Sequence, residues 1–371
     1  KNFKKMQFFD LEAQQQNLKD HIDSAICDVL AHGQYILGPE VALLESKLEA
    51  FTGAAHCTSC GNGTDALQIA LMALGVGAGD EVIVPGFTYI APAEAVAIIG
   101  ATPVYVDIES DTYNIDHTKI ESLISKNTKA IIAVSLFGQC PDFDAINEIA
   151  SQHGLSVIED AAQSFGATYK DHRSCNLSTI ATTSFFPTKP LGCYGDGGAI
   201  FCNNDELASS IRKIARHGQT QRYHHEVIGL NSRLDTIQAS ILLAKLSIFE
   251  NELVLRNEIA SRYINLLKDS KLKSIPVVNK FNKSVWAQFT IEVESRDEVR
   301  AYLKGKNIPT AVYYPTPLHK QPAVQCNTSN LPISEEVSKY VLSLPMGPYL
   351  TEDNQDKIVQ EIKSIVPYKP V

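Results

Sequence analysis

The sequence predicts an α/β protein whose mainly parallel sheet is covered by helices on both faces. Apolar, strand-like runs such as EVIVP (81–85) and KAIIAVSLFG (129–138) alternate with helical patterns between about residues 65 and 203. These runs are almost continuously apolar, as expected of strands that are buried on both faces. After about residue 270 the order of patterns changes, which predicts a smaller α+β domain at the C-terminal end.

The elements of the larger part follow in order along the chain. Thr64 and Asp65 are placed to cap a helix whose apolar residues run to Leu74 and which ends at Gly75. Further strands are predicted at TPVYVDI, LSVIEDAA, TTSFF and GGAIFCN, with helices at 92–100 and 141–154. A helical pattern over 235–267 has few breakers and is long enough to lead from one domain into the next.

The C-terminal part mixes strands and helices. We predict strands at WAQFTIEV (286–293) and PTAVYYP (309–315), and helices at 295–307, near 334–344 and at 352–365. We place the domain boundary after residue 250. Residues 1–250 then form the large domain with an N-terminal helical segment, and residues 251–371 form the small α+β domain.

Composition argues against several classes of function. The 371 residues are 44% hydrophobic and 20% charged, with a net charge of −9 and no long basic run, so nucleic-acid binding is not expected. No apolar segment is long enough to span a bilayer, and KNFKKMQFFDLEAQQQ lacks a secretory apolar core, so we expect a cytoplasmic protein without a membrane partner. The C-x-x-C pair Cys57 and Cys60 is typical of a redox pair or of half a zinc site, but no second C-x-x-C or H-x-x-x-H follows, so we favour buried or spectator thiols.

Two polar motifs fall where predicted strands end, which is the edge of a parallel sheet at which ligands bind. The glycine-rich turn GNGTDAL brings Gly63, Thr64 and Asp65 to a helix start, where backbone N–H groups and the helix dipole attract an anion. A plain helix cap is the alternative. Asp160 and Gln163 follow an apolar strand, so this carboxylate must be paired, solvated or protonated; a turn or capping role stays open.

A constrained lysine and an aromatic residue complete the set. Lys189 lies between Pro187 and Pro190 in the apolar run SFFPTKPLGCYGDGGA (184–199). Such a lysine pairs with a buried carboxylate or loses its proton easily and acts as a nucleophile, with an ordinary surface lysine as the alternative. Tyr89 follows the strand EVIVP and is placed to stack on a flat ligand. A phosphate site, a carboxylate, an aromatic ring and a lysine together match the requirements of pyridoxal 5′-phosphate (PLP).

Five ordered motifs resemble those of the DegT/DnrJ/EryC1 family of sugar aminotransferases. They are GNGTDALQIALMALGVGAGDEVIVPGFTYIA, VIEDAAQSFGA, SFFPTKPLGCYGDGGA, GLNSRLDTIQA and AVYYPTPLH, and the resemblance runs from QFFDLEAQQQ onward. It implies the aspartate-aminotransferase-like type I fold of PLP enzymes, with a mainly parallel seven-stranded sheet in the large domain. It also implies a homodimer whose active sites lie at the subunit interface.

The resemblance implies roles for individual residues. Lys189 corresponds to the lysine that holds PLP covalently and transfers protons, and Asp160 to the partner of the pyridine nitrogen. The remaining implied cofactor contacts are Gly63, Thr64, Asp65 and Ser184 at the phosphate, Tyr89 on the ring, Gln163 at the ring hydroxyl, and Asn231 reaching the phosphate of the other subunit's site. A sister chemistry in the family, a sugar 3-dehydratase, has histidine in place of this lysine. A non-catalytic regulator would be expected to lose the lysine or the aspartate.

Further stretches, among them HGQYILGPEV and RSCNLST, resemble the WbpE-type subgroup. That subgroup moves the amino group of L-glutamate to the C3 keto group of UDP-2-acetamido-2-deoxy-3-oxo-glucuronate, with pyridoxamine phosphate (PMP) as intermediate and 2-oxoglutarate as by-product, in cell-surface polysaccharide (O-antigen, lipopolysaccharide) synthesis. The implied substrate contacts are Gly33, Tyr35, Thr188, Tyr313, Tyr314 and, from the other subunit, Arg233. A guanidinium fork suits a uronate carboxylate. A 4-keto-6-deoxy or other 3-keto-6-deoxy nucleotide sugar is the alternative substrate.

Several residues remain ambiguous. Tyr313 stands where these enzymes commonly have histidine, and a phenol does not titrate near neutral pH, so a charge-based role there is in doubt. His217, His224 and His225 fit no standard zinc spacing, so we expect a loop over the site and no bound metal. For His319, substrate contact and a structural role both stay open.

Overall fold

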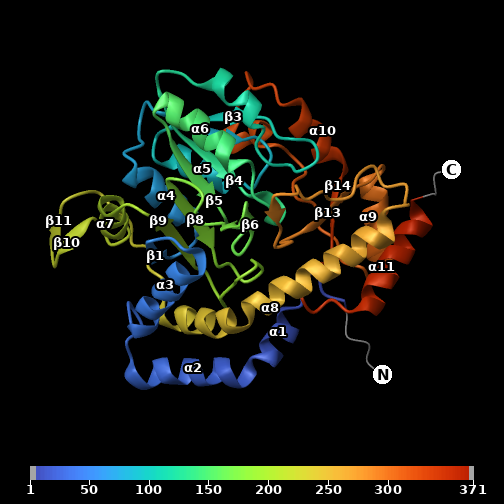
Figure 1. Cartoon of the computed structure of the whole chain (residues 1–371), viewed down its shortest axis with the longest axis horizontal. Coiled ribbons are helices and arrows are strands. Elements are labelled where there is room, and N and C mark those ends of the chain that lie inside the picture. Colours follow the sequence, from blue (N-terminus) through green and yellow to red (C-terminus); the bar gives the residue numbers. More distant parts are fainter. Residues whose placement is uncertain (1–5, 367–371) are drawn as a thin grey trace.

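The computed structural model describes residues 6–366, and a seven-stranded sheet forms its centre (Figure 1). The strand order is β1-β9-β8-β5-β4-β2-β3. The strands are β1 (His56–Cys60), β2 (Glu81–Pro85), β3 (Thr102–Val106), β4 (Thr128–Val134), β5 (Ser156–Asp160), β8 (Ile180–Ser184) and β9 (Gly198–Cys202). All neighbouring pairs from β3 to β8 are parallel, whereas β9 runs antiparallel to both β8 and β1. The predicted α/β class and mainly parallel sheet are confirmed.

Six of these strands coincide with predicted ones, and β1 was missed. The sequence of β1, HCTSC, has only one β-branched residue and no aromatic residue, so it carries little strand signal. It pairs with β9 in register from His56 opposite Cys202 to Cys60 opposite Gly198. A non-local partner therefore creates this strand, and the C-x-x-C pair lies within it as buried free thiols.

Helices cover both faces of the sheet, and alternate residues of each strand divide between two cores. On one face lie α4 (Gly63–Ala73), α5 (Ala91–Ile98) and α7 (Asp205–Ile214), and on the other α3 (Pro39–Thr52), α6 (Phe143–His153) and part of α8 (Thr236–Leu267). In β4, for example, Ile132 packs in the first core while Ile131 and Ala133 pack in the second. This alternation is what a strand buried on both faces requires.

Helix α8 connects the two parts of the chain. It is 32 residues long and runs from beneath the large sheet to the C-terminal helices (Figure 1). The N-terminal helices α1 (Leu11–Asn17) and α2 (Lys19–His32) lie along the same side of the molecule, with α2 packed against α8. The boundary predicted after residue 250 falls inside this continuous helix, and the division into domains stays a prediction.

The C-terminal part has its own apolar core around β13 (Phe289–Glu292), β14 (Val341–Leu344), α9 (Arg296–Gly305) and α11 (Glu352–Ile365). Helix α10 (Pro332–Tyr340) instead packs its Val337 in the first core of the large sheet. Two predictions here were wrong. The run PTAVYYP forms only an isolated bridge between Ala311 and Ser343, because its flanking prolines donate no backbone hydrogen bond. The helix predicted to Leu344 ends at Tyr340, because the apolar run VLSL pairs with β13 as strand β14.

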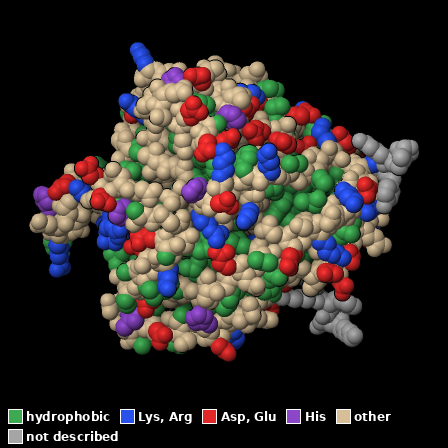
Figure 2. All heavy atoms as spheres, viewed as in Figure 1, with side chains coloured by type: hydrophobic (Ala, Val, Ile, Leu, Met, Phe, Trp, Pro, Cys, Tyr) green, Lys and Arg blue, Asp and Glu red, His purple; other side chains and the backbone are tan. Residues whose placement is uncertain are grey.

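The remaining elements are short. They are the strands β6 (Thr168–Tyr169), β7 (His172–Arg173) and β12 (Asn282–Lys283), and the 3₁₀ turns η1 (His117–Lys119), η2 (Glu121–Leu123), η3 (Leu136–Gly138), η4 (Leu318–Lys320) and η5 (Pro322–Val324). The hairpin of β10 (Gln219–Gln221) and β11 (His224–His225) projects from the body beside α7, and carries basic and histidine side chains (Figure 2). Within residues 6–366, the helices are all too short or too polar to cross a membrane.

Candidate functional site

Lys189 lies on a turn after strand β8 that folds back closely on itself. The Lys189 N–H donates to the Phe186 carbonyl at 2.9 Å. A Cβ at Gly192 would lie 2.6 Å from the carbonyl oxygens of Phe186 and Pro187, so only glycine permits this return of the chain. Together with the fixed φ of Pro187 and Pro190, the close return restricts the backbone that carries the lysine. The structure thus confirms that this lysine is held by its surroundings.

The charge of the Asp160 carboxylate, at the carboxyl end of β5, affects the pKa of the Lys189 amine. Burial lowers the pKa of Lys189, and the Asp160 charge partly opposes this effect. Asp160 is 6% exposed, and its Oδ1 accepts the Ala162 N–H at 3.0 Å. Burial raises the pKa of Asp160, while the Ala162 N–H and the Lys189 charge lower it. An amine in this setting gives up its proton more readily than one in water.

Gln163 is fixed from two sides next to this pair. Its Oε1 accepts the Phe137 N–H at 2.8 Å, and its Nε2 donates to the Tyr314 hydroxyl at 3.2 Å. The Tyr314 ring lies 6.3 Å from the ring of Tyr89, measured between centroids. Burial raises the pKa of Tyr314, so its hydroxyl stays protonated at any ordinary pH. Tyr89 itself is 58% exposed, which leaves a face of its ring open to a ligand.

The start of α4 forms a second wall. Asn62, and not Thr64 or Asp65, is the N-cap: its side chain accepts the Asp65 N–H at 2.8 Å. The prediction that Thr64 and Asp65 cap this helix was wrong. Asn62 lies one position before the first helical residue, so its side-chain oxygen reaches the N–H of the third helical residue, Asp65. The N–H groups of Gly63 and Thr64 belong to the first turn, which has no acceptor within the helix. They are available to an anion.

Close packing brings this helix start against the end of β8. A Cβ at Gly63 would lie 2.8 Å from the Ser184 Cβ. The start of α4 can therefore lie this close to the end of β8 only because residue 63 is glycine. The Asp65 carboxylate turns away to accept the Ser232 hydroxyl at 2.6 Å, and that hydroxyl accepts the Gly61 N–H at 2.9 Å. The side chain of Asp65 therefore ties segment 231–233 to the turn, and its predicted role at the phosphate stays a prediction.

The residues described so far fit PLP as a group. A phosphate suits two free N–H groups and the Ser184 hydroxyl, a pyridine nitrogen suits the buried Asp160 carboxylate, and an aldehyde suits the Lys189 amine. The close approach of Gly63 to Ser184, which a Cβ would prevent, brings the Ser184 hydroxyl next to this helix start.

The predicted substrate residues of segments 33–38 and 231–236 lie together, and Ser232 links them to the turn before α4. Gly33 ends helix α2 in the left-handed conformation, with φ of 70°, and the Tyr35 carbonyl accepts the Thr236 N–H at 3.0 Å. Asn231 is exposed and Arg233 is half-buried, on either side of Ser232. Segments 33–38 and 231–236 are thus joined, and no contact within residues 6–366 links Asn231 or Arg233 to Lys189.

Thr188 and Tyr313 lie nearer the lysine. Thr188 lines the same cavity as Lys189, and the Tyr313 ring lies 6.3 Å from the ring of Phe8 and 5.7 Å from that of Tyr314. Burial raises the pKa of Tyr313, so a charge-based role is disfavoured at this position.

The histidines divide between the hairpin and the C-terminal part. His224 and His225 form β11, and His225 Nδ1 lies 2.8 Å from the His217 carbonyl oxygen. Across residues 6–366, the side chains of His, Cys, Asp and Glu form no group of three that could hold a metal ion. His319 is 4% exposed and its Nε2 lies 3.0 Å from Glu335, which favours the structural role over substrate contact.

Sequence reasoning missed two buried charged residues behind the lysine turn. Glu252 and Arg256 lie on the buried face of α8, and Arg256 lines a cavity that also includes Lys189. The signal was present, because positions 249, 252, 256, 260, 263 and 267 follow one helical stripe and the other four are apolar. Charges on such a stripe require partners or a ligand.

Comparison with known proteins places this arrangement in a family. A profile described as the DegT/DnrJ/EryC1/StrS aminotransferase family matches residues 16–363. A relative from Pseudomonas aeruginosa, named UDP-2-acetamido-2-deoxy-3-oxo-D-glucuronate aminotransferase, is 61% identical over 93% of this chain and 96% of its own.

Two solved structures show the same fold. DesV from Streptomyces venezuelae has a TM-score of 0.96 at 38% identity, covering 99% of this chain and 100% of its own. NtdA from Bacillus subtilis, with bound cofactor PMP, has a TM-score of 0.92 at 31% identity, covering 99% and 86% respectively. The predicted type I fold of PLP enzymes is confirmed, and the chain belongs to the DegT/DnrJ/EryC1/StrS aminotransferase family.

Proposed function

We propose that the protein is a PLP-dependent aminotransferase that moves the amino group of L-glutamate to the C3 keto group of UDP-2-acetamido-2-deoxy-3-oxo-D-glucuronate. The observation that carries the chemistry is the placement of the buried Asp160 carboxylate and the Lys189 turn at the ends of the neighbouring strands β5 and β8, beside a helix start that suits a phosphate. The high identity to the Pseudomonas aeruginosa relative supports the substrate, and its product would enter a cell-surface polysaccharide.

When bound, PLP supplies an electron-withdrawing ring that stabilises negative charge on the amino-acid carbon. Asp160 is suited to hold the proton on the pyridine nitrogen, because a buried carboxylate gains most from a neighbouring positive charge. Lys189 is suited to move the proton between the substrate carbon and C4′ of the cofactor, because burial favours its neutral amine. Gln163 is held by Phe137 and Tyr314 and presents a fixed amide to the ring hydroxyl.

The phosphate would be held by Gly63, Thr64 and Ser184, with Tyr89 against the ring. The presence of both Lys189 and Asp160 argues against a sugar 3-dehydratase and against a regulator without catalysis. The alternative aminotransferase substrate, a 4-keto-6-deoxy nucleotide sugar, needs no group that recognises a carboxylate, whereas Arg233 offers one.

We further propose a homodimer in which Asn231 and Arg233 of the partner subunit complete each site. Large apolar side chains are exposed around the segments concerned: Tyr35 at 49%, Ile36 at 49%, Tyr223 at 80% and Ile228 at 85%. Such side chains gain free energy when a second copy covers them. In that assembly Gly33, Tyr35, Thr188, Tyr313 and Tyr314 would contact the nucleotide sugar.

Absorbance spectroscopy of the PLP-loaded protein tests this proposal. L-glutamate should bleach the visible band of the lysine-bound cofactor. After the donor is removed, the 3-oxo uronate should restore the band, and a UDP-4-keto-6-deoxy sugar should not. Recovery of the band with the 4-keto sugar alone would mean that this sugar, and not the 3-oxo uronate, is the substrate. Failure of L-glutamate and other amino acids to bleach the band would contradict transamination.

A further inference from the structure

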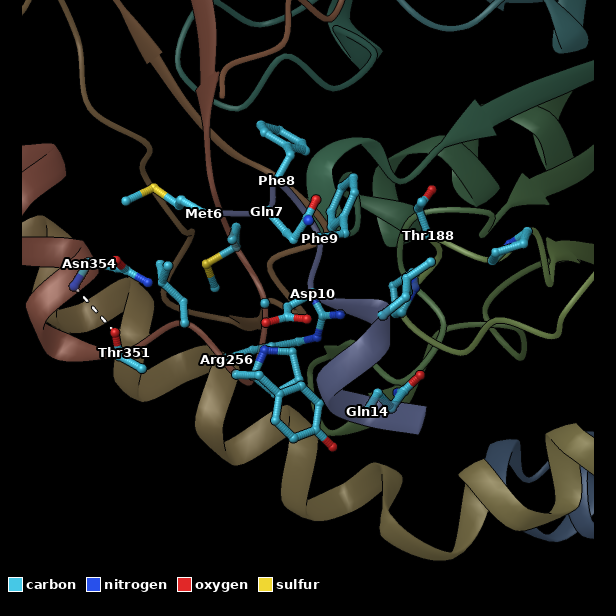
Figure 3. A pocket seen from close by; sticks show the side chains of 18 of the residues that line it. Met6, Gln7, Phe8, Phe9, Asp10, Gln14, Thr188, Arg256, Thr351 and Asn354 are labelled. Atoms are coloured by element: carbon cyan, nitrogen blue, oxygen red, sulfur yellow. Dashed lines mark hydrogen bonds between the residues drawn. The ribbon is translucent and has the colours of Figure 1, made fainter. Parts of the chain in front are cut away.

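Two features near the cofactor wall have no part in the proposed function. The first is a cavity of about 200 Å³ between the lysine turn, the N-terminal segment and the start of α11 (Figure 3). Asp10 and Arg256 both line it, so its wall carries charges of opposite sign and charge alone selects no ligand there. The second feature is Glu159, a fully buried carboxylate in β5 directly before Asp160.

Glu159 is buried on the side of the sheet that faces away from Asp160. Successive side chains of a strand point to opposite faces, and Glu159 contacts Cys175 in the second core of the large sheet. Burial raises the pKa of Glu159 to about 7, hydrogen bonds oppose this effect, and the Asp160 charge adds to it. No lysine, arginine or histidine of residues 6–366 is among the strongest influences on its charge. A buried charge without a cation costs stability, so packing alone does not account for this residue.

The Glu159 carboxylate orders two serine hydroxyls in series. Its Oε1 accepts the Ser174 hydroxyl at 2.5 Å, and its Oε2 accepts the Cys175 N–H at 3.0 Å. The Ser174 Oγ lies 2.8 Å from the Ser164 Oγ. A hydroxyl has one proton to donate, and Ser174 gives its own to the ionised carboxylate, so Ser164 must donate to Ser174. The charge of Glu159 therefore fixes the direction of both hydrogen bonds.

Ser164 belongs to the turn that follows β5 and that also carries Gln163. The Ser164 N–H donates to the Ala161 carbonyl at 3.0 Å, which closes this turn. The neighbouring Gln163 side chain points toward the site, where Oε1 accepts the Phe137 N–H at 2.8 Å and Nε2 donates to the Tyr314 hydroxyl at 3.2 Å. The turn is thus held through Ser164 on the side of the second core while it presents Gln163 to the site.

We propose that Glu159 is a positioning residue, which holds the 161–164 turn through Ser174 and Ser164 and thereby sets the place of the Gln163 amide at the cofactor ring. This inference rests on the proposed function, because the ring hydroxyl that Gln163 faces belongs to PLP. Glu159 would touch neither cofactor nor substrate. Its charge strengthens the series of bonds, because hydrogen bonds to an ionised acceptor are roughly twice as strong as neutral ones and polarise their neighbours. A rigid turn then offsets the cost of burying the carboxylate.

Amide hydrogen exchange of the 371-residue chain with added PLP tests the link without turnover. The probe is the Phe137 N–H, whose exchange requires its bond to Gln163 to open. We expect Ser164→Ala and Ser174→Ala each to speed this exchange about three- to tenfold, because a loosened turn releases the acceptor. Ser178→Ala is the matched control, since its hydroxyl accepts a backbone N–H of β5 at 3.2 Å and is not bonded to the turn. Wild-type exchange at Phe137 in both of the other serine variants would overturn the proposal.

A double-variant comparison shows whether the network acts through Gln163. The visible band of the lysine-bound cofactor is titrated with pH, and the proton that titrates lies on the nitrogen that joins Lys189 to the cofactor. Negative charge on the neighbouring ring oxygen retains this proton, so a hydrogen bond donated to that oxygen lowers the midpoint and its loss raises it. Ser164→Ala should raise the midpoint by about 0.5–1 pH unit. In a Gln163→Ala background it should add nothing, and shifts that simply add would overturn the proposal.

Glu159→Gln tests the charge itself. The amide keeps the shape and an acceptor for Ser174, but it removes the charge and turns an NH₂ group toward the Cys175 N–H. Exchange at Phe137 and the band midpoint should change in the same direction as in Ser174→Ala. A folded Glu159→Gln protein with wild-type values of both would overturn the proposal, and if this variant does not fold, the two serine variants decide. Absence of a visible band in the wild type with PLP would count against the proposed function alone, because exchange at Phe137 does not depend on the band.

Discussion

The two walls of the site are built in opposite ways. The cofactor wall, comprising Lys189, Asp160, Gln163, Gly63 and Ser184, is buried or packed, and its groups are fixed by hydrogen bonds within the chain. The other wall comprises segments 33–38 and 217–233 and is exposed over much of its length. We call it the partner-facing wall, because it would face the second subunit in the proposed dimer. A single chain can therefore organise the chemistry, whereas under the proposed function recognition of the sugar would fall to residues that the fold alone does not cover.

This difference follows from what each wall must do. Proton transfer requires groups held to within a fraction of an ångström, and only a packed environment provides that. Selection of a sugar among related ones depends on loops, which vary without disturbing the sheet. Changes in the cofactor wall should hence remove activity on every substrate, and changes in the partner-facing wall should alter which substrate is used.

The largest effect is expected when Lys189 is replaced. Lys189→Ala should lower kcat for the full reaction by more than a thousand-fold, because the group that carries the proton is gone while the phosphate cradle remains. PLP binding measured by fluorescence should persist in a non-covalent form. Lys268→Ala, an exposed lysine at the end of α8, is the control. Residual activity within tenfold of the wild type would show that another group transfers the proton.

On the partner-facing wall, Arg233→Met should raise KM for the 3-oxo uronate by about ten- to a hundred-fold, since a charged bidentate contact is lost. The absorbance of the bound cofactor and the rate with L-glutamate should stay unchanged, which separates the two walls. Arg300→Met, an exposed arginine on α9, serves as the control. If bound cofactor and uronate turnover fell by the same factor, Arg233 would instead be needed to maintain the cofactor wall.

A smaller effect is expected where the cofactor wall is closest packed. Gly63→Ala puts a methyl group 2.8 Å from the Ser184 Cβ, so the α4 start must move away from β8. Such overpacking costs about 1–3 kcal/mol, and we expect PLP affinity to fall about tenfold in fluorescence titrations. Gly77→Ala, whose Cβ meets no atom within 4 Å, should leave affinity unchanged. If both variants bind PLP equally, Gly63 does not border the phosphate.

The cofactor wall was also the easier one to predict from the sequence. Lys189 and Asp160 lie in short runs whose strands, prolines and glycines fix their surroundings locally, so motif and structure agree. By contrast, β1 arises only from pairing with β9, which lies about 140 residues further along the chain, and VLSL is a strand only because β13 lies beside it. Tertiary partners decided these elements, and no local pattern carries that information.

The cavity at Arg256 shows the same limit. Helical periodicity places Glu252 and Arg256 on the buried face of α8, but the sequence does not show that Gln14 and Tyr349 take the oxygens of Glu252. Those partners come from opposite ends of the chain. The surroundings of Glu252 and Arg256 are therefore visible only in the folded molecule.

The smallest expected effect concerns a second buried lysine, which contacts Tyr194 in the loop that follows Lys189. Lys245 on α8 is 1% exposed, with Nζ over the Tyr194 ring at 4.3 Å and without a hydrogen-bond partner. Burial lowers the pKa of Lys245 to about 8, against the charges of Glu252 and Cys193, which raise it. Because the folded protein disfavours the protonated form, Lys245 costs stability below pH 8, and this cost fades as the pH rises toward the usual lysine pKa.

Lys245→Met should therefore raise Tm by a few degrees at pH 7, which corresponds to about 1–3 kcal/mol, and by clearly less at pH 10. Thermal unfolding of the PLP-loaded protein at the two pH values measures the difference, with Lys268→Met as control. A Tm gain that is the same at both pH values would mean that methionine packing, and not the removed charge, is responsible. A lower Tm of the variant at pH 7 would mean that the contact of Lys245 with Tyr194 stabilises the protein by more than the burial of the Lys245 charge destabilises it. The buried cation would then stabilise the region next to the cofactor wall.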